Sequence, residues 1–460
     1  MADKLSIPKY AQFAAHTDHH KLTFFVHDQL PDSDFMLPPG NTITKLLDIG
    51  AIDLSDPLKV MFVMRPVTGG IKKHLFSLLQ NLNQKQIRPI IVCSPEMPEQ
   101  DYLGALGAAI YHLPICPEIN PIRDWQSARI LRQIIRQTDV DIVHAHSFKA
   151  GYISVLADLL QRQRRKYAFI CTFHNQLRRY NNGLKNYFST AAAAGIGRKA
   201  DRVVVISRAL LAEAVQLMRL PETKVTCVYN GINPSEYAML PPPDQFRREY
   251  GIPEDALLVG TVARLIPQKG IQYLIRAALL LRDRFPKVRY VITGDGPMRQ
   301  QLERQVQAAG LAGIITFAGF RPKIDDFLAA MDLFALPTLE EGLSIAVMEA
   351  MAAAKPVIAS AVGGVPELIT AQTGVLVQPG DAQSLADGIG SLLSMDGAKR
   401  AAMGADGRNL IVERFTDGQI AEEHVRLYED LARQRRRGRG ADAAPNPEPE
   451  PEPAPAPAKE

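Results

Sequence analysis

From Lys59 onward, the sequence alternates apolar runs of strand length with stretches of helical length. Parallel strands need long crossover connections, usually helices, so this alternation is typical of βαβ units and of an α/β fold built on parallel sheets. The two series of strands predict two Rossmann-like halves. The first series is expected at 60–64, 90–93, 141–144, 168–173 and 202–206, and the second at 257–262, 289–293, 314–317, 333–336 and 356–359.

The length of the chain also favours two domains, because 460 residues exceed what one hydrophobic core usually supports. Tyr229-Asn230-Gly231 and the prolines at 241–243 interrupt the pattern between the two series and place the linker there. Apolar side chains recur at helical spacing over 420–435, whereas the Pro, Glu and Ala residues that follow cannot offset their ordering entropy by burial. The predicted units are an extension of uncertain order at 1–55, Rossmann-like domains at 56–235 and 236–415, a helix at 416–436 that packs back toward the first domain, and a disordered tail at 437–460.

Charge and cysteine content narrow the class of protein. A formal charge of +4 is too small for nucleic-acid binding, although basic clusters at 162–166 and at Arg178-Arg179 leave a peripheral contact with an anionic membrane open. The cysteines form no Cys-x-x-Cys pair, which argues against a zinc site or a disulfide framework and favours a reducing compartment. No apolar run reaches the roughly 18 residues of a membrane-spanning helix. We therefore expect a cytoplasmic protein, with a place at the inner face of the membrane left open.

Residues 336–351 carry the most informative pattern, in which a buried strand ends, a glycine-containing loop turns and a helix starts. The free amides of such a helix start, at 342–344, favour a phosphate or a polar sugar. Glu341 lies in the loop and Glu349 about one turn into the helix. Two carboxylates beside a phosphate would repel it, so both are expected to face neutral hydroxyls. The alternative is that Glu341 joins a helix cap and Glu349 a surface ion pair.

Positive charge that could balance such a phosphate follows the first strand of the second half. Arg264 and Lys269 flank a turn that contains Pro and Gly, and their guanidinium and ammonium groups both suit phosphate oxygens. The alternative is an ordinary exposed basic loop. Gly69 and Gly70, after the first strand of the first half, form a second candidate because missing side chains let backbone amides approach a ligand.

Histidines follow two apolar strands of the first half: His144 and His146 come with one, and His174 with Asn175 after the next. In open α/β sheets the ligand crevice lies beyond the carboxyl ends of the strands, so these side chains are expected near a site. The alternatives are hydrogen-bonded packing residues and a His-x-His zinc site that lacks a third ligand at suitable spacing. Neither half shows Gly-x-Gly-x-x-Gly after a strand with an acidic residue about 20 positions on, which argues against an oxidoreductase.

Several of these elements occur together in one known family. Residues 58–435 resemble the retaining glycosyltransferases of family 4, the group 1 enzymes of GT-B architecture, whose two Rossmann-like domains have parallel sheets facing across a cleft. Ser344 and Ala354 stand where many members have Gly, which leaves the donor sugar open. The resemblance rests on Glu341 and Glu349 as a Glu-x7-Glu motif, Ala350-Met351, Lys355 to Ala359, Gly363 to Glu367, Asn230-Gly231-Ile232, Arg264 with Lys269-Gly270, Gly294 to Pro297, and Phe317-Ala318-Gly319.

The resemblance implies transfer of a sugar from a UDP- or GDP-sugar to a hydroxyl acceptor, with retained configuration, in glycan, glycolipid or polysaccharide synthesis. It implies no cofactor and no metal, an acceptor on the N-terminal domain and a donor on the C-terminal domain. His146, Glu341, Arg264 and Lys269 would be the catalytic residues. The resemblance implies that the diphosphate is bound by Arg264, Lys269, Gly69 and Gly70, the ribose by Glu349, and the base by Phe320 and Arg321. It implies that the sugar or its phosphate is bound by Glu341, Gly342, Leu343 and Ser344. The reacting sugar would lie near His146, with His174 and Asn175 as neighbours.

Two alternatives remain at this point. An epimerase or phosphorylase could use the same fold, and a non-catalytic nucleotide-sugar binding protein could keep the same binding residues. Metal-dependent transferases of the other common fold use Asp-x-Asp. Here Asp32-Ser33-Asp34 lies in the extension and Asp139-Val140-Asp141 precedes a strand, so neither motif sits where a donor-bound metal would.

Overall fold

We describe the protein from a computed structural model, at residues 13–18, 21–26, 57–66, 69–82, 86–116, 118–161, 165–175 and 183–442. Most of the predicted extension, Asp32 to Asp34, residues 162–164, Arg178-Arg179 and residues 443–460 lie outside these ranges. Within the extension, β1 (Phe13–Asp18) pairs antiparallel with β2 (Lys21–Val26).

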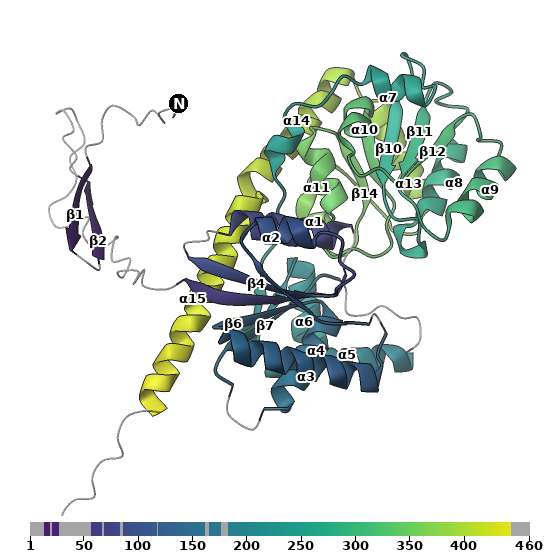
Figure 1. Cartoon of the computed structure of the whole chain (residues 1–460). Coiled ribbons are helices and arrows are strands. Elements are labelled where there is room, and N and C mark those ends of the chain that lie inside the picture. The colour runs from purple at the N-terminus through teal and green to yellow at the C-terminus, as the bar shows by residue number, and fades with distance from the viewer. Residues whose placement is uncertain are drawn as a thin grey trace, which may run out of the picture.

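The N-terminal half is built on a parallel sheet of order β5-β4-β3-β6-β7-β8-β9 (Figure 1). Its central strands are buried throughout and mostly apolar, as expected for a sheet with helices on both faces. The strands are β3 (Leu58–Val63), β4 (Ile87–Cys93), β5 (Ala109–His112), β6 (Ile142–His146), β7 (Ala168–Phe173), β8 (Arg202–Val205) and β9 (Val225–Cys227), and the helices are α1 (Gly70–Asn81), α2 (Gln100–Ala105), α3 (Pro121–Thr138), α4 (Phe148–Leu159), α5 (Gly183–Lys199) and α6 (Arg208–Met218).

The C-terminal half repeats this plan with a parallel sheet of order β12-β11-β10-β13-β14-β15. The prediction of an α/β protein with two parallel, Rossmann-like sheets is therefore confirmed. The strands are β10 (Leu258–Val262), β11 (Arg289–Thr293), β12 (Ile315–Gly319), β13 (Leu333–Leu336), β14 (Val357–Ser360) and β15 (Gly374–Val377), and the helices are α7 (Asp244–Glu249), α8 (Ile271–Leu281), α9 (Arg299–Ala308), α10 (Asp325–Ala330), α11 (Ile345–Ala352), α12 (Val365–Leu368), α13 (Ala382–Leu393) and α14 (Gly397–Arg414).

The chain passes between the halves twice, and the two passages hydrogen-bond to each other. The amide of Ile232 donates to the carbonyl of Phe415 (3.0 Å), and the amide of Asp417 donates to the carbonyl of Ile232 (2.9 Å). A Cβ at Gly231 would lie 2.7 Å from the Cα of Asp417, so only glycine fits between the two passages.

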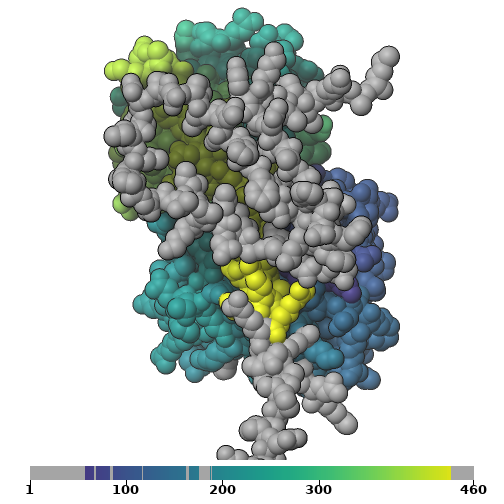
Figure 2. Space-filling model, turned by 90° about the vertical axis from the view of Figure 1, so that its left-hand side faces the viewer, coloured from purple at the N-terminus to yellow at the C-terminus, as the bar shows by residue number. Residues whose placement is uncertain are grey.

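Helix α15 (Asp417–Asp442) then returns to the N-terminal half and packs on α1 (Figure 1), and part of it is visible at the surface between the blue and teal atoms of that half (Figure 2). Its Ile420, Tyr428 and Leu431 join the core formed by β3 and β4. Burying Ile420 and Leu431 contributes about 1.5–3 kcal/mol each. The helix runs to Asp442, past the expected end at 436.

Candidate functional site

Two loops at the carboxyl edge of the C-terminal sheet are hydrogen-bonded together. The amide of Leu339 and the hydroxyl of Thr338, both after β13, donate to the carbonyl of Gln268 at 2.7 and 3.1 Å. Gly270, at φ 65°, makes this approach possible, since a Cβ there would lie 2.0 Å from the carbonyl oxygen of Pro337. The loop after β10, which carries Arg264 and Lys269, is thereby fixed beside the loop that carries Glu341.

Lys269 and Glu341, which the sequence places in separate motifs, form an ion pair across these loops. The Lys269 Nζ lies 2.6 Å from the Glu341 Oε2, and both side chains are largely buried. The Arg264 side chain is exposed, and among the described residues it has no ion pair or hydrogen bond. One cation is thus neutralised by a carboxylate and the other faces solvent at the same edge of the sheet.

The start of α11 has its own cap. The Ser344 hydroxyl accepts a hydrogen bond from the amide of Val347 at 3.4 Å, so Ser344 rather than Glu341 caps this helix. Leu343 is buried beside it. Ala354, just beyond the helix, has a φ of 54°, in the region where glycine is favoured.

Glu349 is buried, with 3% of its surface exposed, so the alternative of a surface ion pair for it is wrong. Its Oε1 accepts a hydrogen bond from the Tyr237 hydroxyl at 3.0 Å and pairs with the half-exposed Lys73 ammonium of α1. Burial, followed by the charge of Glu349, raises the pKa of Tyr237, which therefore stays a hydrogen-bond donor. The pair with Lys73 joins the two halves of the chain at this carboxylate.

Glycines bring the N-terminal half against the same loops. Gly69, at φ 64°, precedes α1, and a Cβ on Gly70 would lie 3.1 Å from the Ile345 side chain at the start of α11. A Cβ on Gly342 would lie 2.4 Å from the carbonyl oxygen of His174. The expected phosphate loops of one half and the expected sugar loop of the other therefore meet.

A cluster of buried imidazoles forms the N-terminal side of this region. The Nδ1 of His146 lies 3.2 Å from the Nε2 of His174, and its Nε2 is buried without a partner among the described residues. His144, 4.1 Å from His146 between ring centroids, is held by the Tyr428 hydroxyl of α15 (2.8 Å) and by Thr172 (2.6 Å). This arrangement agrees with the packing alternative for His144 and leaves His146 with an open nitrogen.

Two further histidines, His74 of α1 and His424 of α15, complete the imidazole cluster, which we define as His74, His144, His146, His174 and His424. Burial, followed by the other imidazoles, lowers the pKa of His74, His144 and His146 well below the ordinary value, and burial lowers that of His424 to about 4. These rings are neutral near pH 7. Among the residues that the structure describes, no three His, Cys, Asp or Glu side chains are arranged to hold a metal ion.

Other expected residues lie apart from these contacts. Asn175 is exposed, and Phe320 is 74% exposed. The Arg321 guanidinium binds Glu249, Asp326 and the Tyr250 hydroxyl, so this side chain is engaged within the C-terminal half. Asp139 ends α3 at φ 44°, and the Asp141 carboxylate accepts from the amide of Lys59, so both have local structural roles.

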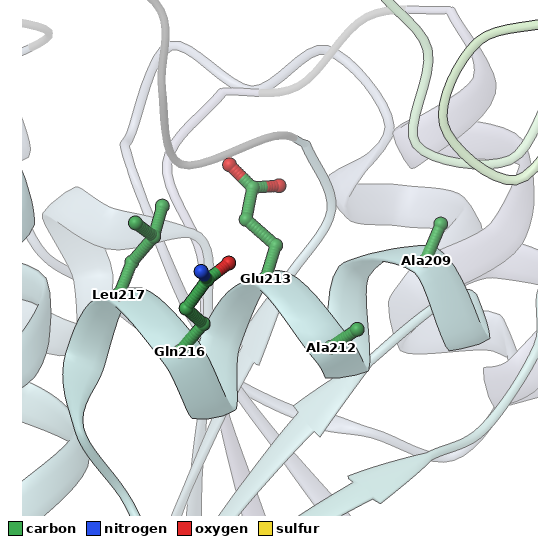
Figure 3. Close-up of a pocket in the computed structure, with 5 residues that line it drawn as sticks. All are labelled: Ala209, Ala212, Glu213, Gln216 and Leu217. Carbon is green, nitrogen blue, oxygen red and sulfur yellow. The ribbon is translucent and has the colours of Figure 1, made fainter.

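The surface also has a hollow along α6, lined by Ala209, Ala212, Glu213, Gln216 and Leu217 (Figure 3). Figure 3 shows the side chains of Glu213, Gln216 and Leu217 pointing to the same side of the helix. None of the expected site residues lines this hollow. The candidate site therefore rests on the contacts between the loops and not on this cavity.

Two family profiles match consecutive parts of the chain. The profile of Glycosyltransferase Family 4 matches residues 68–236, and that of Glycosyl transferases group 1 matches residues 243–410. The chain belongs to the group 1 glycosyltransferases. The loops with Arg264, Lys269 and Glu341 of this glycosyltransferase fall in the second matched range, and His146 in the first.

Curated relatives of this glycosyltransferase include an uncharacterized glycosyltransferase of Methanocaldococcus jannaschii, 33% identical over 50% of this chain and 60% of that protein. A UDP-Gal:α-D-GlcNAc-diphosphoundecaprenol α-1,3-galactosyltransferase of Escherichia coli is 24% identical over 80% of this chain and 95% of the relative. The chain thus spans little more than half of the archaeal relative and nearly all of the bacterial one.

Solved structures agree with the GT-B fold of this glycosyltransferase. HepE of Anabaena in complex with UDP superposes with a TM-score of 0.69 at 22% identity, covering 81% of this chain and 100% of HepE. Sucrose-phosphate synthase of Thermosynechococcus elongatus gives 0.69 at 21% identity, over 82% and 100% of the two chains. At these identities the likeness concerns the fold alone.

Proposed function

We propose that this chain is a retaining, metal-independent glycosyltransferase that moves a sugar from a nucleotide diphosphate donor to a hydroxyl acceptor. One observation carries the proposal: the Glu341–Ser344 loop, which is ion-paired to Lys269, lies against the backbone of His174, a member of the imidazole cluster of the N-terminal half. A diphosphate needs cations, whereas sugar and ribose hydroxyls can hydrogen-bond to carboxylates and to neutral imidazoles. In this proposal, residues 236–415 form the donor domain and residues 56–235 the acceptor domain.

The two cations of the loop after β10 would hold the diphosphate. Arg264 is exposed and uncommitted among the described residues, and Lys269 would exchange Glu341 for phosphate oxygens when the donor binds. The leaving diphosphate gains negative charge as the glycosidic bond breaks, and both cations stabilise that charge. Glu341, released from Lys269, would then accept hydrogen bonds from the sugar hydroxyls. The two side chains supply the positive charge that a metal supplies in other transferases.

Glu349 would hold the ribose hydroxyls of the donor. Its carboxylate is buried and fixed by Tyr237, and its second partner, Lys73, comes from the opposite half and is half-exposed. The ribose would therefore replace the Lys73 ammonium and leave the bond from Tyr237 in place. Binding of the nucleotide would exchange a contact between the halves for a contact with the ligand.

His146 would contact the reacting sugar. Its Nε2 is buried without a partner among the described residues, and a buried polar atom of this kind costs about 1–3 kcal/mol unless a ligand satisfies it. An acceptor hydroxyl arriving on the face of the departing diphosphate would give up its proton with help from the leaving phosphate, which retains the configuration. Closure of the two halves would exclude water that hydrolyses the donor.

The donor base is proposed as uracil or guanine. The Escherichia coli relative is named for UDP-Gal, and HepE has been solved with UDP and with UDP-glucose. A relative of Mycolicibacterium smegmatis, 31% identical over 60% of its length, is named as GDP-mannose-dependent. UDP-sugars are therefore the first to test, and GDP-sugars the second.

A donor screen tests the proposal. The protein is incubated with UDP-, GDP- and ADP-sugars, with and without sugar and glycolipid acceptors, and products are read by mass spectrometry and by the anomeric proton in NMR. We expect a free nucleoside diphosphate and an acceptor extended by one α-linked sugar. An isomerised donor would instead indicate an epimerase, a sugar phosphate a phosphorylase, and binding without turnover a non-catalytic protein.

The acceptor side carries an exposed apolar patch, which we propose faces a lipid surface. Ile119, Ile122 and Trp125, at the start of α3, are 62%, 73% and 48% exposed, and Arg123 lies among them. A buried ion pair of Asp124 with Lys149 ties this patch to the first turn of α4, the helix that follows His146. Aliphatic side chains, a tryptophan and an arginine suit the interface of an anionic membrane.

This placement supports a lipid-linked acceptor presented at the inner face of the cytoplasmic membrane. Among the described residues, no helix is both long and apolar enough to cross a bilayer. Trp125 is the only tryptophan of the chain, so its fluorescence reports on the patch alone. Vesicles containing phosphatidylglycerol should shift the emission to shorter wavelength, and the protein should rise with them on flotation. Ile122→Asp should abolish both effects, and an unchanged emission in the wild-type protein would contradict the membrane proposal.

A further inference from the structure

One carboxylate of the C-terminal half is held entirely by the N-terminal half. Glu367 of α12 accepts three hydrogen bonds: from the amide of Arg208 (2.9 Å), from the amide of Ala209 (3.0 Å) and from the Tyr229 hydroxyl (2.9 Å). All three donors belong to the half that carries the imidazole cluster. Glu367 belongs to the Gly363–Glu367 segment, to which the donor site assigns no role.

The contact uses the free amides of a helix start. Helix α6 begins at Arg208, and the Ser207 hydroxyl accepts from Leu210 at 3.2 Å, so Ser207 satisfies one amide of the first turn. The two carboxylate oxygens of Glu367 satisfy the amides of Arg208 and Ala209. An anion at this position also meets the positive end of the helix dipole. The first turn of α6 is therefore completed by a residue of the opposite half.

The same segment supports the loop that carries the expected sugar-binding residues. The amide of Gly364 donates to the carbonyl of Gly342 at 2.9 Å. A Cβ on Gly364 would lie 2.4 Å from that oxygen and 2.7 Å from the Ser207 Cβ, so the backbones meet here without room for a side chain. Gly342 in turn lies against the carbonyl of His174, whose ring pairs with His146.

We propose that Glu367 is a positioning residue for sugar transfer. By binding the start of α6, it sets the distance between the Glu341–Ser344 loop and the imidazole cluster, and thus between donor and acceptor groups. Glu367 is not among the residues expected to contact the donor, such as Arg264, Lys269 and Glu349. This inference rests on the proposed function for its kinetic consequence and on the three hydrogen bonds for its structural one.

The kinetic test compares Glu367→Ala with Glu254→Ala, a matched control that removes an exposed carboxylate with no side-chain partner among the described residues. For Glu367→Ala, we expect the dissociation constant for UDP or GDP to stay within about twofold while kcat falls about 10- to 100-fold, because misplacement of reacting groups by about 1 Å can cost about that much. Glu367→Gln should lie between the two, since one oxygen still accepts. A kcat within twofold of the wild type, or a parallel loss of nucleotide binding, would overturn the proposal.

A structural readout separates this inference from the proposed function. Small-angle scattering of the ligand-free Glu367→Ala protein should show a larger radius of gyration than the wild type and than Glu254→Ala, whereas an unchanged radius would overturn the positioning role. Tyr229→Phe removes one of the three bonds without changing charge, and it should give a smaller loss of kcat than Glu367→Ala. This variant keeps the proposal testable if Glu367→Ala proves poorly folded. If the wild-type protein transfers no sugar, the proposed function is wrong, but the scattering experiment still tests the structural role of Glu367.

Discussion

The two halves of this glycosyltransferase bring different kinds of polar group to the candidate site: ionisable basic and acidic side chains on one side and neutral imidazoles on the other. The C-terminal half offers two basic side chains, Arg264 and Lys269, and two acidic ones, Glu341 and Glu349. The N-terminal half offers the imidazole cluster, whose members with lowered pKa values are neutral there. The difference matches two demands of the proposed reaction: basic and acidic groups for the diphosphate and the hydroxyls of the donor, and neutral hydrogen bonding beside the reacting sugar.

The halves also differ in how the chain assembles their groups. The charged side is built from two neighbouring loops of one sheet, whose backbones are hydrogen-bonded to each other. The imidazole cluster collects side chains from α1, β6, the end of β7 and α15, so it exists only when α15 has packed on the N-terminal half. One side is set by local loop geometry and the other by tertiary packing.

The largest effect is expected from removing the cations. Arg264→Ala and Lys269→Ala should each lower kcat/KM about 100- to 1,000-fold, as loss of one group that stabilises developing charge commonly does. Melting temperature should change little for Arg264→Ala, because that side chain is exposed. Lys287→Ala is the control, since its ion pair with Asp255 is exposed and lies on another loop. Near-normal turnover in both variants would remove the charged side from the mechanism.

The neutral side should respond less strongly. His146→Ala should lower kcat about 10- to 100-fold, because the hydrogen bond from Nε2 to the sugar is lost, and His146→Gln should recover part of it. The pKa of His146 is lowered by burial, so its titration should not appear in the rate profile between about pH 6 and 8. His112→Ala, at an exposed histidine, is the control. A rate step near pH 6.5 that His146→Gln abolishes would contradict a neutral imidazole.

Glu349 tests the junction of the two sides. Glu349→Gln should raise the dissociation constant for the nucleotide about tenfold and lower kcat less, because hydrogen bonds to charged groups are worth about 1.5–3 kcal/mol. Tyr237 can still donate to the amide oxygen, so the site should keep its shape. Calorimetric titration with UDP or GDP measures the effect. Equal affinity in the variant and the wild type would place the ribose elsewhere.

The sequence pattern was sufficient for the fold where strands are buried, and it failed at three of the four edges of the two large sheets. Strands β7, β11 and β13 were predicted to the residue, since each contains a run of buried, largely apolar side chains between turns. The pattern missed β5, β9 and β15. Each is only three or four residues long, and β5 is exposed at both ends, so no run of buried side chains marks it. Burial, which drives the pattern, is weakest where a sheet ends.

The site shows the same limit for a different reason. The motif with Glu341 and Glu349 is contiguous, so its placement at the start of α11 followed from spacing. The partners of these residues did not: Lys73 lies 276 positions from Glu349, and Tyr428 lies 284 positions from His144. Separations of this size carry no periodic signal, so such pairs emerge only once the two halves and α15 are packed.

The smallest effect concerns stability and tests whether the imidazole cluster is neutral in the folded protein. The folded pKa values of His74, His144 and His146 are lowered well below that of the unfolded chain, and that of His424 to about 4. Above about pH 6.5 neither state binds these protons, and stability is complete. As the pH falls below that value, these histidines become protonated in the unfolded chain but stay neutral in the folded protein. The free energy of unfolding should then fall by about 1.4 kcal/mol per pH unit for each such histidine.

Urea unfolding at several pH values between about 5 and 7 measures this slope. His424→Gln removes one of the histidines while its amide can still donate to the carbonyl of Ile420, so the slope should become shallower by about 1.4 kcal/mol per pH unit. The exposed His112→Gln should leave the slope unchanged, and carboxylates that titrate in the same range cancel in the comparison. If His424→Gln and the wild type give the same slope, His424 is protonated alike in both states, and the uncharged character assigned to the N-terminal side does not extend to α15.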